Sequence, residues 1–247
     1  DSIENPFVDL QAGDLEESES HPLDLEDFPS DVPTVVLPNK VIALESAGLT
    51  DVGGGRQHNE DFFAIDNRVT QIIDPHDVSI GCRGLYILCD GMGGHAKGEV
   101  ASRLATETLV QYFSNHWKEE IPSEADLKDA IYCTNRTLYT LNEEGQSRHG
   151  KGRMGTTLVL ALLKDTQFRF VHVGDSRLYR LTHHHGFEQL TVDHEVGQRD
   201  ISRGVAPELA YARHDAYQLT QALGPRSDDV LQPNPQSLTL KEDTVFL

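Results

Sequence analysis

The sequence contains no long hydrophobic run, few basic residues and few cysteines, and each shortage excludes a class of protein. No apolar stretch approaches the roughly 20 residues of a membrane-spanning helix, and no basic segment followed by an apolar one marks a signal peptide. The chain has 21 Lys and Arg residues against 40 Asp and Glu residues, so its formal net charge is −19. Because no basic stripe can neutralise phosphates, we expect neither a nucleic-acid partner nor binding to an anionic membrane.

The three cysteines are Cys82, Cys89 and Cys133, an odd number without CxxC spacing. This pattern argues against a disulfide framework and against a thiolate metal site. We therefore expect a reducing compartment and a cytoplasmic location.

The acidic residues are concentrated at the start of the chain. Residues 1–39 contain 11 Asp or Glu residues and no Lys or Arg, which leaves a net charge of −8 for the rest. With only isolated Leu and Phe, residues 1–33 cannot bury enough apolar area to offset the entropy of ordering them. We expect a disordered acidic tail over residues 1–33 and one globular domain over residues 34–247.

Hydrophobic periodicity predicts the elements of that domain. The wholly apolar run 85–89 indicates a strand buried on both faces. Helical spacing appears over residues 99–113 and again from an N-cap at Ser123 to residue 145. Ordered segments are expected at 34–37 and 40–49, a hairpin or irregular loop at 68–84, short helices or a loop from 194 to 217, and strands at 62–65, 156–163, 167–173, 177–181, 187–190, 237–240 and 244–247.

Strand groups surround a central helix pair in this order, without a regular βαβ alternation. That arrangement favours an α+β fold, an antiparallel β-sandwich flanked by helices in α-β-β-α layers.

The most informative stretch is LYILCDGMGGHAKG, residues 85–98. An apolar strand delivers Asp90 to its end, and the glycines that follow let backbone approach another group closely. Asp-Gly alone is also a common hairpin signal, although a helix follows here. The letters match a dinucleotide-binding fingerprint as well, but that reading requires a second parallel strand where this chain continues as helix.

A second cluster places Arg56 four residues before the adjacent acids Glu60 and Asp61. The ordinary interpretation is a solvated ion pair. Adjacent strand residues point to opposite faces, so at most one of the two acids can face a given site directly.

Three further polar segments have simpler interpretations. Asp175 lies in VGDSR between two apolar strands, where a tight hairpin would suit Gly-Asp-Ser. Asp193 in LTVDH could cap a helix. The histidines at 183–185 are most easily a hairpin tip, because no second cluster pairs with them as a zinc site would require.

The order of these motifs is more specific than any one of them. RxxxED, DGMGGH, GTT, VGDSR, LTxDH and LTQALG follow one another from Arg56 to Gly224. Together they resemble the metal-dependent protein phosphatases of type 2C, the PPM family, over residues 49–247. DGMGGH with VGDSR is the form typical of bacterial members.

The resemblance implies a serine/threonine protein phosphatase that acts on phosphorylated proteins, expected as a monomer. Asp90 would bridge two Mn²⁺ or Mg²⁺ ions, and Gly91 would lend one of them its carbonyl oxygen. Glu60 and Asp61 would hold metal-bound waters, while Asp175 would help to hold a third, weaker ion.

Arg56 would grip the substrate phosphate, a task suited to a two-pronged guanidinium. Hard oxygen ligands suit Mn²⁺ or Mg²⁺. Two such cations can activate a water for direct attack on phosphorus, so the cysteines need no catalytic role.

Two departures from the family pattern leave alternatives open. The histidine proposed as general acid in animal members is replaced by Met92, and His95 three residues on cannot be assumed to substitute for it. Two further metal-ligating aspartates would follow Leu247. The sequence therefore predicts a domain incomplete at its C-terminus, cut from a longer chain that is an active phosphatase. The alternative is an inactive pseudo-phosphatase that binds phosphoproteins or regulatory partners.

Overall fold

The computed structural model describes residues 41, 43–56, 58–73, 78–93, 97–149 and 153–247, all within the unit Asn39–Leu247. The predictions for the tail and for residues 34–37 lie outside these ranges. Residues 43–50, where an ordered segment was expected, form no helix or strand. Val41 and Leu44 nevertheless pack against a buried cluster of the domain.

A long hairpin forms one edge of the main sheet. Strands β1 (Asp61–Ile73) and β2 (Val78–Met92) pair antiparallel, with Asp61 opposite Asp90. The strands predicted at 62–65 and 85–89 are confirmed, and both extend into the segment where a hairpin or an irregular loop was expected: residues 68–73 pair with residues 78–83 as the outer part of the hairpin.

The larger sheet has the order β1-β2-β4-β5-β8, with the two-residue β3 (Gly155–Thr156) also paired to β2. Its other strands are β4 (Leu158–Lys164), β5 (Gln167–Val173) and β8 (Gln236–Thr239). Every neighbouring pair is antiparallel.

Residues 158–163 of strand β4 are apolar because both faces of the strand are covered. Side chains alternate between the faces of a strand. The side chains on one face lie in the core between the sheet and the helices, namely Leu158, Leu160 and Leu162. The other set lies in the second core, namely Val159, Ala161 and Leu163.

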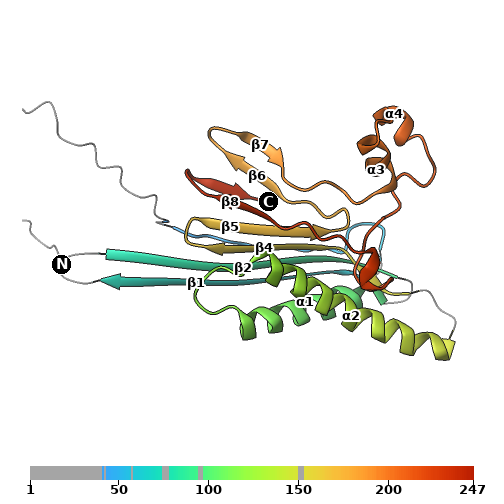
Figure 1. The fold of residues 1–247 in the computed structure, drawn as a ribbon, viewed down its shortest axis with the longest axis horizontal. Coiled ribbons are helices and arrows are strands. Elements are labelled where there is room, and N and C mark those ends of the chain that lie inside the picture. Colours follow the sequence, from blue (N-terminus) through green and yellow to red (C-terminus); the bar gives the residue numbers. More distant parts are fainter. Residues whose placement is uncertain (1–40, 42, 57, 74–77, 94–96, 150–152) are drawn as a thin grey trace, which may run out of the picture. The chain divides into compact units, whose positions relative to one another are not determined.

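Two helices cover one face of this sheet: α1 (Lys97–His116) and α2 (Glu124–His149) lie side by side beneath it (Figure 1). The predicted N-cap of α2 is confirmed. The backbone and hydroxyl of Ser123 both donate to the Asp126 carboxylate, and the Asp126 N–H donates back to the Ser123 hydroxyl at 3.2 Å. No helix in the described part of the chain is long and apolar enough to cross a membrane.

A three-stranded sheet covers the opposite face. Its order is β7 (Gly186–Gln189), β6 (Tyr179–Thr182), β9 (Thr244–Phe246). The rings of Phe168 on β5 and Phe246 on β9 stack with their centroids 3.9 Å apart, which joins the two sheets. The predicted antiparallel β-sandwich with helices is confirmed.

Two details differ from the sequence predictions. The run 85–89 is not buried on both faces, since Leu88 is 41% exposed while Leu85, Ile87 and Cys89 lie in the helix-side core. The later helices α3 (Val196–Ser202) and α4 (Pro207–Ala210) are short and lie at one end of the sandwich, rather than covering the outer sheet as a layer (Figure 1).

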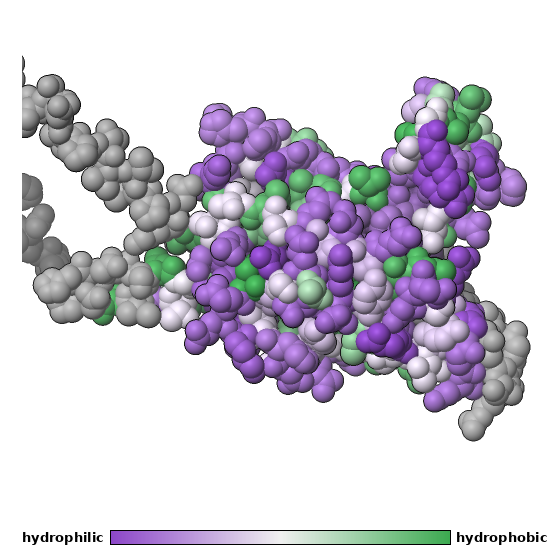
Figure 2. Space-filling model, in the orientation of Figure 1, coloured by the Kyte–Doolittle hydropathy of each residue, from purple (hydrophilic) through white to green (hydrophobic). Residues whose placement is uncertain are grey.

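The surface seen in Figure 2 is mostly hydrophilic, with hydrophobic atoms at the α3–α4 end and in scattered places elsewhere. Leu209 is 67% exposed and Tyr217 is 71% exposed in this segment. The short 3₁₀ helix Asp228–Val230 follows it and leads to β8.

Candidate active site

The end of β2 brings Asp90 against Asp61. The two residues are directly opposed in the β1–β2 ladder, so their side chains lie on the same face of the sheet. In addition to burial, the charge of the Asp61 carboxylate acts on the Asp90 carboxyl group and raises its pKa. Of the two adjacent acids Glu60 and Asp61, it is therefore Asp61 that faces Asp90.

Negative charge is concentrated at this point. The pKa of Asp90 is raised to about 6, first by burial and then by the charges of Asp61 and Asp175, while Arg56 opposes the shift. Taken as a whole, Asp90 is exposed to solvent, but its carboxyl group is partly buried by neighbouring protein atoms. A cluster of this kind favours a bound cation.

The backbone around Asp90 is fixed by the neighbouring strand. The Asp90 N–H donates to the Thr157 hydroxyl at 3.0 Å, and the Thr157 N–H donates to the Asp90 carbonyl at 2.9 Å. The Thr156 hydroxyl donates to the same carbonyl at 2.9 Å. GTT belonged to the motif series, but its role in holding Asp90 was not apparent from sequence because it depends on pairing across 67 residues.

The glycines after Asp90 permit a close approach to α1. A Cβ atom on Gly91 would lie 2.0 Å from the Gly98 carbonyl oxygen, and one on Gly98 would lie 2.6 Å from the Glu60 carboxylate. The Gly91 N–H donates to the Glu60 carbonyl at 3.0 Å. The Ser102 hydroxyl on α1 donates to that same carbonyl at 2.6 Å. The Asp-Gly pair is thus not a hairpin turn; it packs a strand end against a helix start.

Arg56 lies at the edge of this cluster and forms an ion pair with Glu60. The Arg56 side chain is 68% exposed and that of Glu60 only 15%. The ion pair anticipated from sequence is therefore present, and it aims an exposed guanidinium at the side of the cluster that faces solvent.

Asp175 comes from a different part of the chain. It lies in the turn between β5 and β6, partly buried, and its charge acts on Asp90. The next residue, Ser176, shares a hydrogen bond of 2.7 Å with the Thr157 hydroxyl. The structure thus brings Asp61, Asp90 and Asp175 to one region, as the motif order suggested.

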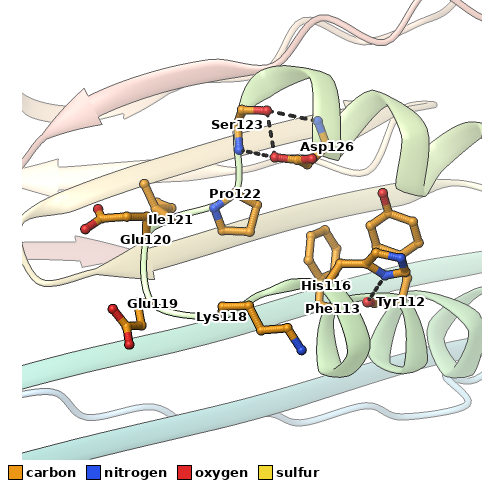
Figure 3. A pocket seen from close by; sticks show the side chains of 10 residues that line it. All are labelled: Tyr112, Phe113, His116, Lys118, Glu119, Glu120, Ile121, Pro122, Ser123 and Asp126. Atoms are coloured by element: carbon orange, nitrogen blue, oxygen red, sulfur yellow. Dashed lines mark hydrogen bonds between the residues drawn. The ribbon is translucent and has the colours of Figure 1, made fainter.

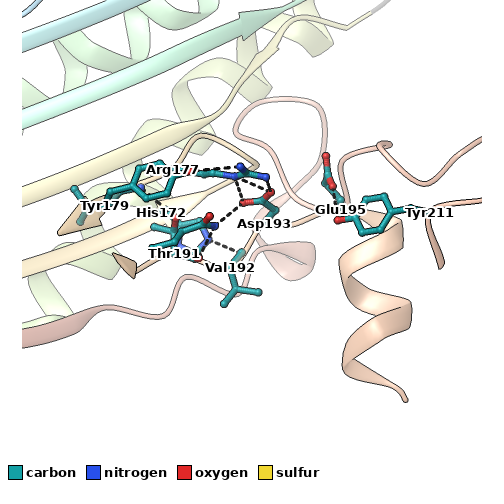
Figure 4. Close-up of polar contacts among 10 residues, drawn as sticks. His172, Arg177, Tyr179, Thr191, Val192, Asp193, Glu195 and Tyr211 are labelled. Carbon is teal, nitrogen blue, oxygen red and sulfur yellow. Dashed lines mark hydrogen bonds and ion pairs between the residues drawn. The ribbon is translucent and has the colours of Figure 1, made fainter. Parts of the chain in front are cut away.

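Two sequence expectations about other polar residues are resolved. Asp193 does not cap α3: the N-cap position is Glu195, without a side-chain cap bond, and Asp193 instead accepts from Arg177 (Figure 4). The histidines 183–185 do lie at the β6–β7 hairpin tip, where His184 pairs with Glu242 at 2.7 Å.

The general acid stays unassigned. Met92 is the last residue of β2, opposite Gly155, and its thioether cannot donate a proton. His95 lies outside the described residues.

A depression of about 480 Å³ lies away from the candidate site residues. It opens between the end of α1 and the start of α2, near Tyr112, His116 and Asp126 (Figure 3). None of the candidate site residues lines it.

The donor set fits a hard divalent cation in its chemistry. Carboxylates from Asp61, Asp90 and Asp175 and the Gly91 carbonyl are all oxygen ligands. Within the part of the chain that the structure describes, no three His, Cys, Asp or Glu side chains converge as a ready-made metal cluster.

Comparison with known proteins identifies one family. The sequence pattern described as "Protein phosphatase 2C" matches residues 68–200. The match includes Asp90, Gly91 and Asp175 and begins after Arg56 and Asp61.

One relative is the protein phosphatase PhpP of Streptococcus pneumoniae. It is 30% identical over 206 residues, which cover 83% of this chain and 76% of PhpP.

Solved structures agree with this similarity. PppA, a key regulatory component of T6SS in Pseudomonas aeruginosa, superposes with a TM-score of 0.61 at 27% identity, covering 84% of this chain and 77% of PppA. The catalytic domain of the serine/threonine phosphatase PstP, solved with two manganese ions, superposes with a TM-score of 0.52 at 26% identity, covering 75% of this chain and 76% of that one.

Proposed function

Since this chain belongs to the type 2C protein phosphatase family, a family of metal-dependent serine/threonine phosphatases, we propose that it hydrolyses phosphoserine and phosphothreonine in proteins at the carboxylate cluster around Asp90. The observation that carries this placement is the opposition of Asp61 and Asp90 across the β1–β2 ladder, within reach of the charge of Asp175 and beside an exposed arginine.

Each residue has a role that its position supports. Asp90, at the centre of the cluster, holds the catalytic ions together with the Gly91 carbonyl. Asp61 holds waters bound to these ions from the opposite strand. Glu60 holds waters of the same kind and also orients Arg56 through their ion pair. Asp175 contributes from the β5–β6 turn to a third, weaker ion.

Arg56 binds the phosphate group of the substrate. Its guanidinium is anchored on one side by Glu60 and exposed on the other, so it can present N–H donors to two phosphoryl oxygens. The exposed position suits a substrate that arrives as part of a protein surface.

The cofactor that this site suits is a pair of Mn²⁺ or Mg²⁺ ions. PstP holds two manganese ions in its own structure. Bound there, such ions supply Lewis-acid activation of water and offset charge on the phosphoryl oxygens. The charges of Asp61 and Asp175, which add to burial in raising the pKa of Asp90, support this assignment.

The setting that we propose is a reducing compartment such as the cytoplasm, with a monomeric enzyme. Cys82 and Cys89 are buried free thiols and Cys133 is a partly buried one, which agrees with a protein that forms no disulfides.

A peptide assay tests the proposal. Turnover of phosphoserine, phosphothreonine and phosphotyrosine peptides is measured with Mn²⁺, with Mg²⁺ and with EDTA. We expect metal-dependent release of phosphate from the first two. Binding of phosphopeptides without any turnover, in the presence of saturating Mn²⁺, would instead identify the pseudo-phosphatase.

A further inference from the structure

The turn that carries Asp175 is clamped at both of its ends by two consecutive residues from another part of the chain. Gly174 begins the turn and contacts His194, while Arg177 ends it and contacts Asp193. Neither Asp193 nor His194 has a role in the function proposed above.

At the Gly174 end, two hydrogen bonds run in opposite directions. The Gly174 N–H donates to Nδ1 of His194 at 3.1 Å, and the His194 N–H donates to the Gly174 carbonyl at 2.9 Å. Because Nδ1 accepts a proton donor, it must itself be unprotonated, so the imidazole is held in its neutral form with the proton on Nε2.

The ring of His194 is fixed by a second histidine. It stacks on His172 with the centroids 4.4 Å apart. The His172 Nε2 lies 2.8 Å from the Val192 carbonyl, to which it must donate, and His172 is only 8% exposed. The acceptor nitrogen of His194 is therefore held in one orientation.

At the Arg177 end, the contact is a two-pronged ion pair. Arg177 donates through Nε at 3.0 Å and through a terminal nitrogen at 2.6 Å to the Asp193 carboxylate, which is 6% exposed (Figure 4). Gln189 donates to the same carboxylate at 3.2 Å. Two parallel bonds fix the orientation of both partners as well as their separation.

Between the two clamps lie only Asp175 and Ser176. The Ser176 hydroxyl bonds the Thr157 hydroxyl, which accepts from the backbone of Asp90. Gly174 has φ of +107°, and a Cβ there would lie 2.7 Å from the Thr157 side chain. The clamps, the turn and Asp90 thus form one continuous network of contacts.

We propose that Asp193 and His194 are positioning residues that fix the distance of the Asp175 carboxylate from Asp90, and thereby set the affinity of the ion that Asp175 helps to hold. This inference rests on the proposed metal site. Groups that orient a metal ligand from behind commonly change metal affinity by about 10- to 100-fold when they are replaced.

The test is calorimetric titration of Mn²⁺ into the full-length protein and its variants. Asp175→Asn identifies the binding step that depends on Asp175. His194→Phe keeps the stacked ring but removes the acceptor, and we expect it to weaken that same step about 10-fold. His194→Asn returns an acceptor oxygen near the position of Nδ1 and should restore affinity to within about threefold of the wild type. Hydrogen exchange at the Gly174 amide should rise in the Phe variant and fall back in the Asn variant.

His172→Phe is the matched control, because it changes the other ring of the same stack and leaves both bonds to Gly174 in place. We expect its Mn²⁺ affinity to stay within about threefold of the wild type. Should His194→Phe fail to fold, Arg177→Lys carries the test from the exposed end of the turn, where loss of the two-pronged contact should weaken the same step.

Wild-type affinity in His194→Phe or in Arg177→Lys, or equal weakening by His194→Phe and His172→Phe, would overturn the positioning role. Asp90→Asn separates this failure from a failure of the proposed function. If Asp90→Asn still binds Mn²⁺ as the wild type does, the proposed metal site is wrong. If Asp90→Asn loses Mn²⁺ binding, the metal site stands and only the positioning role of Asp193 and His194 is wrong.

Discussion

Asp61 and Asp90 stand opposite each other in the β1–β2 ladder, so their side chains lie on the same face of the sheet. Burial raises the pKa of Asp90 and the charge of Asp61 adds to the shift, because two carboxylates held close together repel each other. The pair is costly without a positive charge nearby. Its arrangement on facing strands therefore suits binding of a divalent cation rather than stability of the fold.

The first prediction concerns Arg56. Its replacement by Ala should raise KM for a phosphothreonine peptide and lower kcat/KM roughly 10- to 100-fold. This corresponds to a loss of about 1.5–3 kcal/mol of transition-state stabilisation, because a charge-assisted hydrogen bond to phosphate is lost. The melting temperature should hardly change, since the side chain is 68% exposed. Arg68→Ala is the control, because Arg68 forms a comparable exposed pair with Asp66. An unaltered kcat/KM in the Arg56 variant would leave that residue as a surface ion pair only.

The second prediction concerns Thr157, which is 2% exposed. Replacement by Val keeps the shape but removes the hydroxyl that accepts from the Asp90 backbone and bonds Ser176. We expect the free energy of unfolding to fall by about 1–3 kcal/mol, because a buried donor is left unsatisfied. Urea unfolding measures this loss. Thr157→Ser retains the hydroxyl and should keep most of the stability; an equal loss in both variants would assign the effect to packing.

The third prediction concerns pH. The pKa of His194 is lowered to about 4, first by burial and then by the neighbouring His172. In the unfolded chain a histidine titrates near pH 6.5. Between these values the unfolded state binds the extra proton, so the stability contributed by neutral His194 is complete above about pH 6.5 and is lost as pH falls towards 4.

The variant His194→Phe cannot take up that proton. Its free energy of unfolding should therefore fall less than that of the wild type between pH 7 and pH 5, by about 1–2 kcal/mol if solvent screening is modest. Urea unfolding at both pH values, with EDTA present in all samples, gives the comparison. Parallel losses in the two proteins would show that His194 titrates normally in the fold.

Much of the fold could be predicted from local pattern. The strand at 167–173 and the Ser123 cap were placed correctly, because an apolar run and a capping residue are written in consecutive letters. For the outer part of the β1–β2 hairpin, the sequence did not distinguish a hairpin from a loop, because its residues are mixed in polarity. Its strands are held by pairing with each other, which local pattern does not encode. The exposure of Leu88 depends on what covers the sheet, which no local pattern encodes.

The candidate site divides in the same way. The sequence predicted that an apolar strand places Asp90 at its end. It also predicted the ion pair between Arg56 and Glu60, which are four residues apart. The partners of Asp193 and His194 could not be predicted, because Arg177 is 16 residues and Gly174 is 20 residues away in the chain. The neighbouring residues alone predicted that Asp193 caps a helix. In the structure its carboxylate instead accepts hydrogen bonds from Arg177, 16 residues away in the chain.

The central claim is that Asp90 holds the catalytic ions, and Mn²⁺ titration of Asp90→Asn tests it most directly. The matched control is Asp66→Asn, which changes a β1 carboxylate outside the cluster. Calorimetry and phosphothreonine-peptide turnover are measured on both variants and on the wild type. The account predicts that Asp90→Asn loses Mn²⁺ binding and nearly all metal-dependent turnover while Asp66→Asn keeps both; Mn²⁺ affinity and turnover near those of the wild type in Asp90→Asn would contradict it.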